Sequence, residues 1–362
     1  MSDARTSHPY HMYEAVRAQP LLIDKIFARR AEIEKVADAV AKKDRVTFVG
    51  IGTSLHAARI CESWMRELTA GRLLAHVEQS FELLHHPIAF GPSDAVIVIT
   101  HTGTSSASVE ALKRARATGA LTVAITGENC GEGARIADVR IETCDQEKAF
   151  AYTKSYTTAL ATLALMIIRV AARKNLLAKP DASEQLARVP NWMLEALDLE
   201  PLVKSLARGI APLHRLEIFG SGAGWATASE AALKIKEAAY IAAEGFDTEE
   251  ILHGPFSETD SRAALIGLLT GMPSDARARQ ILRAAGELGL TRVAIATPSA
   301  NHDVAAEIVL LVSECGEWLS AFIHLIPLQL LTYFLAVERG ASPDSGRMEQ
   351  PGHRAASQHY KY

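Results

Sequence analysis

Apolar residues along the chain gather in short runs that alternate with longer segments of helical period. The runs "RVTFVGIG" from Arg45, "DAVIVIT" from Asp94 and "LTVAITG" from Leu121 are typical of strands buried on both faces. Helical patterns lie between them, in "SLHAARICESWMREL" and "SVEALKRARATGA", and another precedes them over residues 12–27. Strands that alternate with helices predict crossover units, so the pattern indicates an α/β protein with parallel sheets covered by helices.

The same pattern occurs twice along the chain. "RVTFVGIG" matches "RLEIFGSG" from Arg215, which places Gly50 opposite Gly220 at an offset of 170 residues. The same offset sets "VIVIT" against "LIGLLT" and "TVAIT" against "RVAIA". Several matches at one offset indicate two copies of a single α/β unit.

The repeat sets the expected domain boundaries. We expect an N-terminal helical segment over residues 1–34, a first domain over 35–180, a linker over 181–200, a second domain over 201–340 and a tail over 341–362. The linker includes part of the less periodic "KPDASEQLARVPNW", in which two prolines interrupt the pattern.

Composition and charge restrict the class of partner. The 362 residues are 48% hydrophobic and carry a formal net charge of −4, which does not favour nucleic acid or a membrane surface. We therefore expect a small-molecule ligand. The four cysteines lie far apart without a CxxC pair, so neither a disulfide framework nor a zinc site is expected. The polar start and the short apolar stretch from Ser155, which falls below the length of a membrane span, predict a cytoplasmic protein.

Hydroxyl side chains follow two predicted strands of the first copy, in "GIGTSLH" and "ITHTGTSSAS". The second copy reads "GSGAGWA" and "TGMPSDA" there, so most hydroxyls are lost. Ligands of open parallel sheets bind beyond the carboxyl ends of the strands, where helix N-termini attract anions. Neither a GxGxxG nor a GxxxxGK[ST] motif is present, so we expect a compact phosphate rather than a nucleotide. Each hydroxyl taken alone has an alternative role as a helix N-cap.

Three charged residues share one face of the helix expected over "TASEAALKIKEAAYIAAEGF". Glu230, Lys234 and Glu237 stand at i, i+4 and i+7. A surface stripe of salt bridges is one interpretation; an acid/base group facing a cleft is the other, because the remaining residues are mostly small or apolar. His253, in the expected turn of "EEILHGPFS", adds a group that titrates near neutral pH, although a structural role is the alternative there.

Five segments carry a resemblance to a known family: "GIGTSLHAA", "ITHTGTSSAS", "AYTKSYTTAL", "EAALKIKEAAYIAAEGFDTEEILHGP" and "PLQLLTYFLAVERG". From Met12 to Asp344 the chain resembles the sugar isomerase (SIS) domain proteins, above all the isomerase half of glucosamine-6-phosphate synthase and the SIS-type glucosamine-6-phosphate deaminases and fructosamine-phosphate deglycases. The resemblance implies two tandem SIS domains, each a doubly wound, flavodoxin-like parallel sheet flanked by helices. It further implies a homodimer with shared active sites and no metal or organic cofactor.

The resemblance also implies roles for individual residues. In the family, the segments matching "GTS" and "THTGTSS" hold the sugar phosphate, which points to Thr53, Ser54, Thr100, Thr102 and Ser105. His101 stands where the family often has Gln, and is expected either to add charge to the phosphate site or to signal a different substrate. Glu237 is expected to carry a proton between C1 and C2, with Lys234 assisting. His253 is expected to open the sugar ring and to reach the active site of the other subunit.

The tail departs from the family pattern. The synthase has a lysine four residues after its "PR" that forms an imine with the ketose, whereas counting from Arg347 leads here to Pro351, and Lys361 is the only tail lysine. No cysteine precedes Cys61, so release of ammonia from glutamine is not expected. The implied function is a phosphosugar isomerase acting on a sugar or amino-sugar 6-phosphate, with or without deamination. The alternatives are a fructosamine-phosphate deglycase and a non-catalytic sugar-phosphate sensor.

Overall fold

The computed structural model describes residues 5–360, which divide into two compact units. Unit 1 comprises the chain up to Pro20, Lys148–Thr153 and Val189–Ala355. Unit 2 comprises Leu21–Glu147, Lys154–Arg188 and the chain from Ala356. Two helices cross from one unit into the other, α1 (His11–Ala28) and α15 (Pro351–Ser357).

Unit 2 contains a five-stranded parallel sheet in the order β2-β1-β3-β4-β5. Its strands are β1 (Arg45–Gly50), β2 (Ala75–Gln79), β3 (Asp94–Ile99), β4 (Leu121–Thr126) and β5 (Val139–Glu142). The central strands β1, β3 and β4 are those expected from the apolar runs, and they are buried almost throughout because helices cover both faces. The order is that of flavodoxin-like doubly wound sheets.

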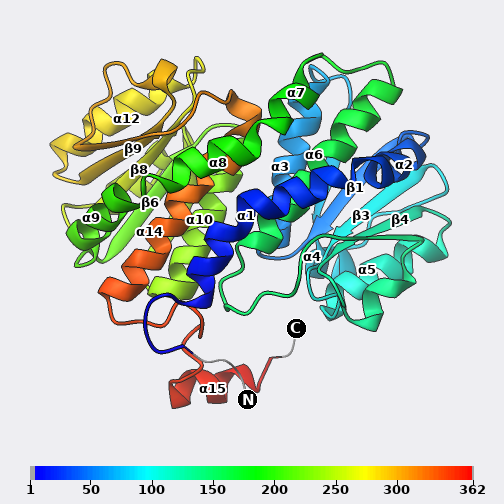
Figure 1. The fold of residues 1–362 in the computed structure, drawn as a ribbon, viewed down its shortest axis with the longest axis horizontal. Helices are drawn as coiled ribbons and strands as arrows, with labels where there is room; N and C mark the ends of the chain where they lie inside the picture. The colour runs from blue at the N-terminus through cyan, green and yellow to red at the C-terminus, as the bar shows by residue number, and fades with distance from the viewer. Residues whose placement is uncertain (1–4, 361–362) are drawn as a thin grey trace. The chain divides into compact units, whose positions relative to one another are not determined.

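Helices cover both faces of the unit 2 sheet. They are α2 (Arg30–Val40), α3 (Thr53–Leu68), α4 (Ser80–His85), α5 (Ser106–Ala117), α6 (Lys154–Arg173) and α7 (Ala182–Ala187), with a 3₁₀ turn, η1 (Glu132–Ile136). α3 packs on β1, β2 and α6, whereas α5 packs on β3 and β4. Figure 1 shows α3 and α6 on the opposite side of this sheet from α5.

Unit 1 repeats this architecture with the sheet β10-β9-β8-β6-β7, which is the same order counted from the other edge. Its strands are β6 (Arg215–Gly220), β7 (Ala242–Asp247), β8 (Ala263–Leu269), β9 (Thr291–Ala296) and β10 (Ile308–Leu311). The offset of 170 residues maps β1 onto β6 and β4 onto β9 residue for residue. The internal match in the sequence therefore corresponds to equivalent strands.

The helices of unit 1 also lie on both faces of its sheet. They are α8 (Val189–Leu197), α9 (Glu200–Ile210), α10 (Ala223–Ala239), α11 (Pro255–Glu258), α12 (Asp275–Glu287), α13 (Ser320–Ile323) and α14 (Leu325–Glu338), with the 3₁₀ turns η2 (Glu250–Leu252), η3 (Pro298–Ala300) and η4 (Glu317–Leu319). α10 packs on β6, β7 and α14, and α12 packs on β8 and β9. α7 and α8 occupy most of residues 181–200, the segment expected to be a linker.

The helix that carries the charged residues is shorter than expected. The sequence predicts one helix over "TASEAALKIKEAAYIAAEGF", but α10 ends at Ala239 and the last residues of that stretch belong to β7. Tyr240 ends the helix in the left-handed conformation, with φ of 59°. A tyrosine is not a usual residue for that position, so this helix end depends on tertiary contacts.

Two apolar segments are long enough to cross a membrane by length and composition. They are α6, with 20 residues, and Glu317–Glu338, with 22 residues. The charge-free stretch from Ser155 is only part of α6, and the segment Glu317–Glu338 is a second apolar stretch that the sequence analysis did not consider. However, 89% and 94% of their apolar windows are buried inside the structure, as is usual for the core helices of a globular protein.

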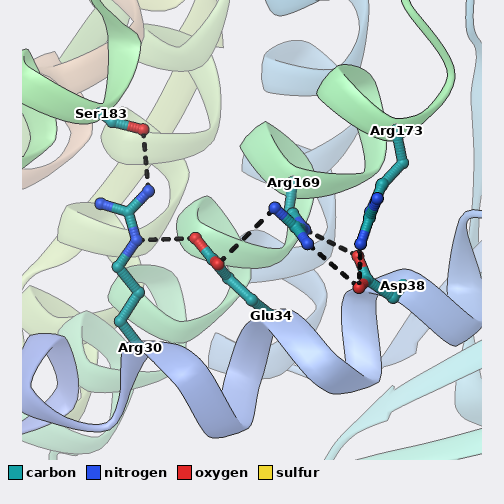
Figure 2. Close-up of polar contacts among 6 residues, drawn as sticks. All are labelled: Arg30, Glu34, Asp38, Arg169, Arg173 and Ser183. Carbon is teal, nitrogen blue, oxygen red and sulfur yellow. Dashed lines mark hydrogen bonds and ion pairs between the residues drawn. The ribbon is translucent and has the colours of Figure 1, made fainter.

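A network of arginine and carboxylate side chains joins α2 to α6 in unit 2 (Figure 2). Asp38 accepts hydrogen bonds from Arg173, at 2.7 and 2.8 Å, and from Arg169, at 2.6 and 3.1 Å. Those bonds hold the pKa of Asp38 well below its usual range. Arg169 also lies 3.8 Å from Glu34, which pairs with Arg30. Because the network is partly exposed, each of its ion pairs adds little to the stability of the fold.

Candidate active site

The first group of predicted hydroxyl residues lies where β1 passes into α3. Thr53 and Ser54 are the first two residues of α3, directly after Gly52, which has φ of 57°. A Cβ on Gly50 would come within 2.4 Å of the Ser54 backbone, so glycine is needed where the helix start approaches the strand. Unit 1 has the same construction at Gly222, with φ of 55°. This turn explains why glycines recur in both copies.

The second group of hydroxyl residues follows β3. Thr100 is buried at the strand end, Thr102 accepts a hydrogen bond from the Thr104 hydroxyl at 2.8 Å, and Ser105 stands at the N-cap position of α5. The Ser105 side chain makes no capping hydrogen bond, and the N-cap of α3 is a glycine. The alternative that these hydroxyls serve as helix caps is therefore not what the structure shows. Because β1 and β3 are adjacent parallel strands, both groups lie at the same edge of the sheet.

The side chain of His101 is held by neighbouring backbones at this edge of the sheet. Its ring lies against Gly127, where a Cβ would be 2.4 Å from Cε1, and its Nε2 accepts a hydrogen bond from the backbone N–H of Glu147 at 3.2 Å. Burial, reinforced by the nearby ammonium of Lys154, lowers the pKa of His101 to about 4. The ring is therefore neutral at physiological pH in this structure, and its contribution to a phosphate site stays a prediction. Its contacts instead tie the loop after β3 to two neighbouring backbones.

The charged face of α10 points inward, toward a cavity of unit 1. Lys234 Nζ forms an ion pair with the Glu237 carboxylate and lies 3.7 Å from Glu230 Oε1. Glu230 and Lys234 are almost completely buried, whereas 23% of the Glu237 side chain is exposed. The interpretation as a surface stripe of salt bridges is therefore excluded. The buried ammonium of Lys234 partly neutralises the negative charge of both carboxylates. Of the two, only Glu237 reaches solvent.

Glu237 lines a cavity of about 390 Å³ within unit 1. The wall consists of Phe150, Lys236, Glu237, Tyr240, Ile241, Ala242, Gly346, Arg347 and His353. The tail thus folds back beside the predicted proton carrier and supplies two basic side chains, Arg347 and His353. Reasoning from the sequence did not assign either of them to the site. The sequence offers one indication of these residues, the Gly, Arg and His residues of "SGRMEQPGHR" after the last apolar helix. That segment does not indicate which element it packs against.

His253 lies outside the lining of this cavity. It follows η2 in a turn, as expected from the adjacent Gly254 and Pro255, and 65% of its side chain is exposed. Its nearest carboxylate is Glu249, at 3.6 Å from Nε2. Within a single chain the structure does not place His253 beside Glu237. Its action in the active site of another subunit stays a prediction.

Other candidate groups are absent from the described part of the chain or lie beyond it. Between residues 5 and 360, no group of three or more His, Cys, Asp or Glu side chains is placed to hold a metal ion. The four cysteines are free thiols and are buried. Lys361, the only lysine of the tail, lies outside the described residues.

Comparison with known proteins identifies relatives along most of the chain. Residues 39–169 match the SIS domain family. The chain is 30% identical over 353 residues to glutamine–fructose-6-phosphate aminotransferase (isomerizing) of Thermococcus kodakarensis, covering 95% of this chain and 58% of the relative. It is 28% identical to the Pseudomonas aeruginosa protein of the same name, covering 93% of this chain and 57% of the relative. The chain thus spans somewhat more than half the length of these relatives.

Solved structures show the same fold at lower sequence identity. The C-terminal domain of glucosamine-fructose-6-phosphate aminotransferase from Francisella tularensis superposes with a TM-score of 0.86 at 23% identity, over 94% of this chain and 99% of that domain. Glucosamine-6-phosphate deaminase from Thermotoga maritima has a TM-score of 0.74 at 21% identity, over 93% and 97% of the two chains. The chain contains a SIS domain and is homologous to the part of the glutamine–fructose-6-phosphate aminotransferases that it covers.

Proposed function

We propose that the protein is an isomerase that interconverts the aldose and ketose forms of a sugar or amino-sugar 6-phosphate. The observation that carries this proposal is the environment of Glu237: a carboxylate that opens onto a cavity of about 390 Å³, with its charge compensated from behind by the buried Lys234. Such a group is placed to remove a proton from a bound molecule of sugar size. The names of the relatives support the substrate class, since they include a glutamine–fructose-6-phosphate aminotransferase (isomerizing) and a tagatose-6-phosphate ketose/aldose isomerase from Escherichia coli.

The proposed reaction is a proton transfer between neighbouring carbons. Glu237 takes the proton from C2 of the open-chain aldose phosphate, and the C–H electron pair forms a C1–C2 double bond while the carbonyl π pair moves onto O1, which gives an enediolate. A proton passes from the O2 hydroxyl to O1, the O2 electron pair forms the C2 carbonyl, and the return of the proton from Glu237 to C1 gives the ketose. Lys234 stabilises the carboxylate between the two transfers. His253 is proposed to open the sugar ring in the active site of the other subunit of a homodimer.

The phosphate is proposed to bind at the carboxyl edge of the unit 2 sheet. The starts of α3 and α5 direct backbone N–H groups and partial positive charge toward that edge. The hydroxyl donors assigned there are Thr53, Ser54, Thr100, Thr102 and Ser105. Unit 1, which repeats the strand order of the unit with the family match, is proposed to be a second SIS domain. We propose a cytoplasmic enzyme that needs neither metal nor organic cofactor and binds neither nucleic acid nor membrane.

Replacing Thr102 by alanine is expected to weaken binding of fructose 6-phosphate about 10-fold, because one hydrogen bond to a charged phosphate oxygen is lost. The dissociation constant measured by isothermal titration checks this. Thr118→Ala, at the opposite end of α5, is the matched control and should bind like the wild type. An unchanged affinity in Thr102→Ala would show that the phosphate lies elsewhere.

Proton exchange tests the proposed reaction directly. The purified protein is incubated in D₂O with a panel of glucose 6-phosphate, fructose 6-phosphate, glucosamine 6-phosphate and fructosamine 6-phosphate, and the C1 and C2 protons are followed by NMR. Deuterium at C1 or C2 of at least one sugar is the expected result. Release of ammonia from glucosamine 6-phosphate identifies a deaminase, and release of amine from fructosamine 6-phosphate identifies a deglycase. Stabilisation of the fold by these sugars without any exchange would replace the isomerase by a sensor.

A further inference from the structure

The cavity beside Glu237 contains a second strongly charged group, Arg347, for which the proposed mechanism has no use. Its guanidinium carbon lies 4.2 Å from the centroid of the Tyr240 ring, and its Nη1 lies 3.5 Å from Nε2 of His353. Throughout residues 5–360, Arg347 has no ion-pair partner, and its Nε is buried without a hydrogen-bond acceptor. A buried donor on a cation is costly when nothing accepts from it. Within the described residues no carboxylate neutralises the Arg347 guanidinium, so the cavity favours a ligand that presents a negatively charged or polar oxygen to it.

The backbone holds Arg347 in this position through unusual conformations. Arg347 and Tyr240 are both left-handed, with φ of 64° and 59°, and the Arg347 N–H donates to Tyr240 Oη at 2.8 Å. Gly346, directly before Arg347, has φ of 55°, and a Cβ there would lie 2.5 Å from the Phe150 ring. Left-handed residues other than glycine cost on the order of 1 kcal/mol each and persist only where the surroundings impose them. Two such residues that contact each other across one cavity indicate a preorganised site.

We propose that Arg347 is the oxyanion-stabilising residue of this cavity, a role that rests on the proposed isomerase function. When Glu237 removes the carbon-bound proton, the C–H electron pair forms the C1–C2 double bond and the carbonyl π pair moves onto its oxygen. The Arg347 guanidinium donates hydrogen bonds to that oxygen and so stabilises an enediolate. The proton that left C2 is carried by Glu237. A proton then passes from the O2 hydroxyl to O1, the O2 electron pair forms the C2 carbonyl, and the C1–C2 π pair takes the proton from Glu237 at C1, which gives the ketose. No oxidant, reductant or covalent bond to the protein is required.

The choice of arginine determines the chemical route. A guanidinium stays protonated, presents N–H groups in a plane and does not condense with a carbonyl to form an imine. Among the residues that line the cavity, Glu237 is the one carboxylate and Arg347 is the basic side chain that is both partly buried and fixed by ring stacking. Lys236 also lines the cavity, but it is exposed on α10. The geometry thus favours an enediolate stabilised by hydrogen bonds over an imine with lysine.

Two substitutions of Arg347 and one matched control test this assignment. Arg347→Met removes the charge but keeps an apolar side chain over Tyr240, and Arg347→Lys keeps the charge without the planar donors. Arg354→Met is the control, because Arg354 belongs to the same tail, within α15, but does not line the cavity. The rate of deuterium incorporation and the KM are measured with each sugar of the panel that the wild type exchanges. Thermal unfolding of each variant shows whether the tail still folds.

We expect Arg347→Met to lower kcat for exchange about 10²-fold with little change in KM, since a lost oxyanion donor acts mainly on the transition state. Arg347→Lys should lie between that variant and the wild type, and Arg354→Met should match the wild type. A wild-type kcat in Arg347→Met would overturn the assignment, as would an equal loss in Arg354→Met. A lysine adduct trapped by borohydride and found by mass spectrometry would overturn the hydrogen-bonded route. Absence of exchange in the wild type would instead refute the proposed isomerase function, and the role of Arg347 with it.

Discussion

Replacing Glu237 by glutamine is expected to reduce C1–C2 proton exchange by about 10²-fold or more while leaving the affinity for the sugar phosphate nearly unchanged. Glutamine has the size and shape of the carboxylate and still fills its place at the cavity wall, but it does not accept a proton from carbon. The loss therefore appears in kcat rather than in KM. Deuterium incorporation measured by NMR, together with isothermal titration of the same sugar, separates the two quantities.

The matched control for this change is Glu287→Gln, on the exposed end of α12, which should exchange protons at the wild-type rate. The substitution at Glu237 also removes one of the two carboxylates beside Lys234. Thermal unfolding of both variants shows whether any loss of activity reflects unfolding. Retention of full turnover in a folded Glu237→Gln protein would exclude Glu237 as the proton carrier. A retained ligand response in a wild-type protein that shows no turnover would support the sensor instead.

Acidification from pH 7 toward pH 4 is expected to destabilise the protein through two buried histidines, His324 and His101. Burial lowers the pKa of each to about 4, from about 6.5 in an unfolded chain. The unfolded state therefore binds protons below pH 6.5 while the folded state stays neutral. The stabilising contribution is complete above pH 6.5 and is lost as the pH falls toward 4. Each histidine accounts for about 3 kcal/mol of the free energy of unfolding over that range.

His324 offers the sharper test because it is completely buried and, within the residues that the structure describes, neither ring nitrogen has a hydrogen-bond partner. His324→Leu removes the titrating group and two unsatisfied polar atoms at similar volume, so its stability at pH 7 should equal or exceed that of the wild type. Urea unfolding at pH 7, 5.5 and 4.5 should show the wild type losing about 2–3 kcal/mol more than the variant. His214→Leu, at an exposed position, is the matched control. Parallel pH dependences of wild type and His324→Leu would contradict the prediction.

The central strands could be predicted because their signal is local. β1, β3 and β4 each have neighbours on both edges and helices on both faces, so nearly every position is apolar. The sequence pattern does not predict the outer strands β2 and β7, for the opposite reason. Each pairs along one edge only, and their sequences, "AHVEQ" and "AAEGFD", contain no apolar run. The first residues of β7 continue the helical pattern of α10, so the sequence predicts helix where the structure has a strand.

The candidate site was predictable where spacing along one element suffices. Glu230, Lys234 and Glu237 fall on one face of any α-helix, and the structure confirms that Lys234 lies beside both carboxylates. Whether that face points to solvent or to a cavity depends on the packing of α10, which the spacing does not contain. The charge of His101 likewise could not be predicted, because its pKa is set by burial and by Lys154, 53 residues further along the chain.

The sequence by itself determined the α/β class, the internal repeat at 170 residues, the hydroxyl-bearing strand ends and the charged face of one helix. These features follow from periodicity and from short-range geometry, which act within a single element. Only the tertiary structure decided where α10 ends, which of its carboxylates reaches a cavity, and that the tail supplies Arg347 and His353 to the wall of that cavity. Those outcomes depend on contacts between residues far apart in the chain, such as Arg347 on Tyr240, which no local pattern specifies.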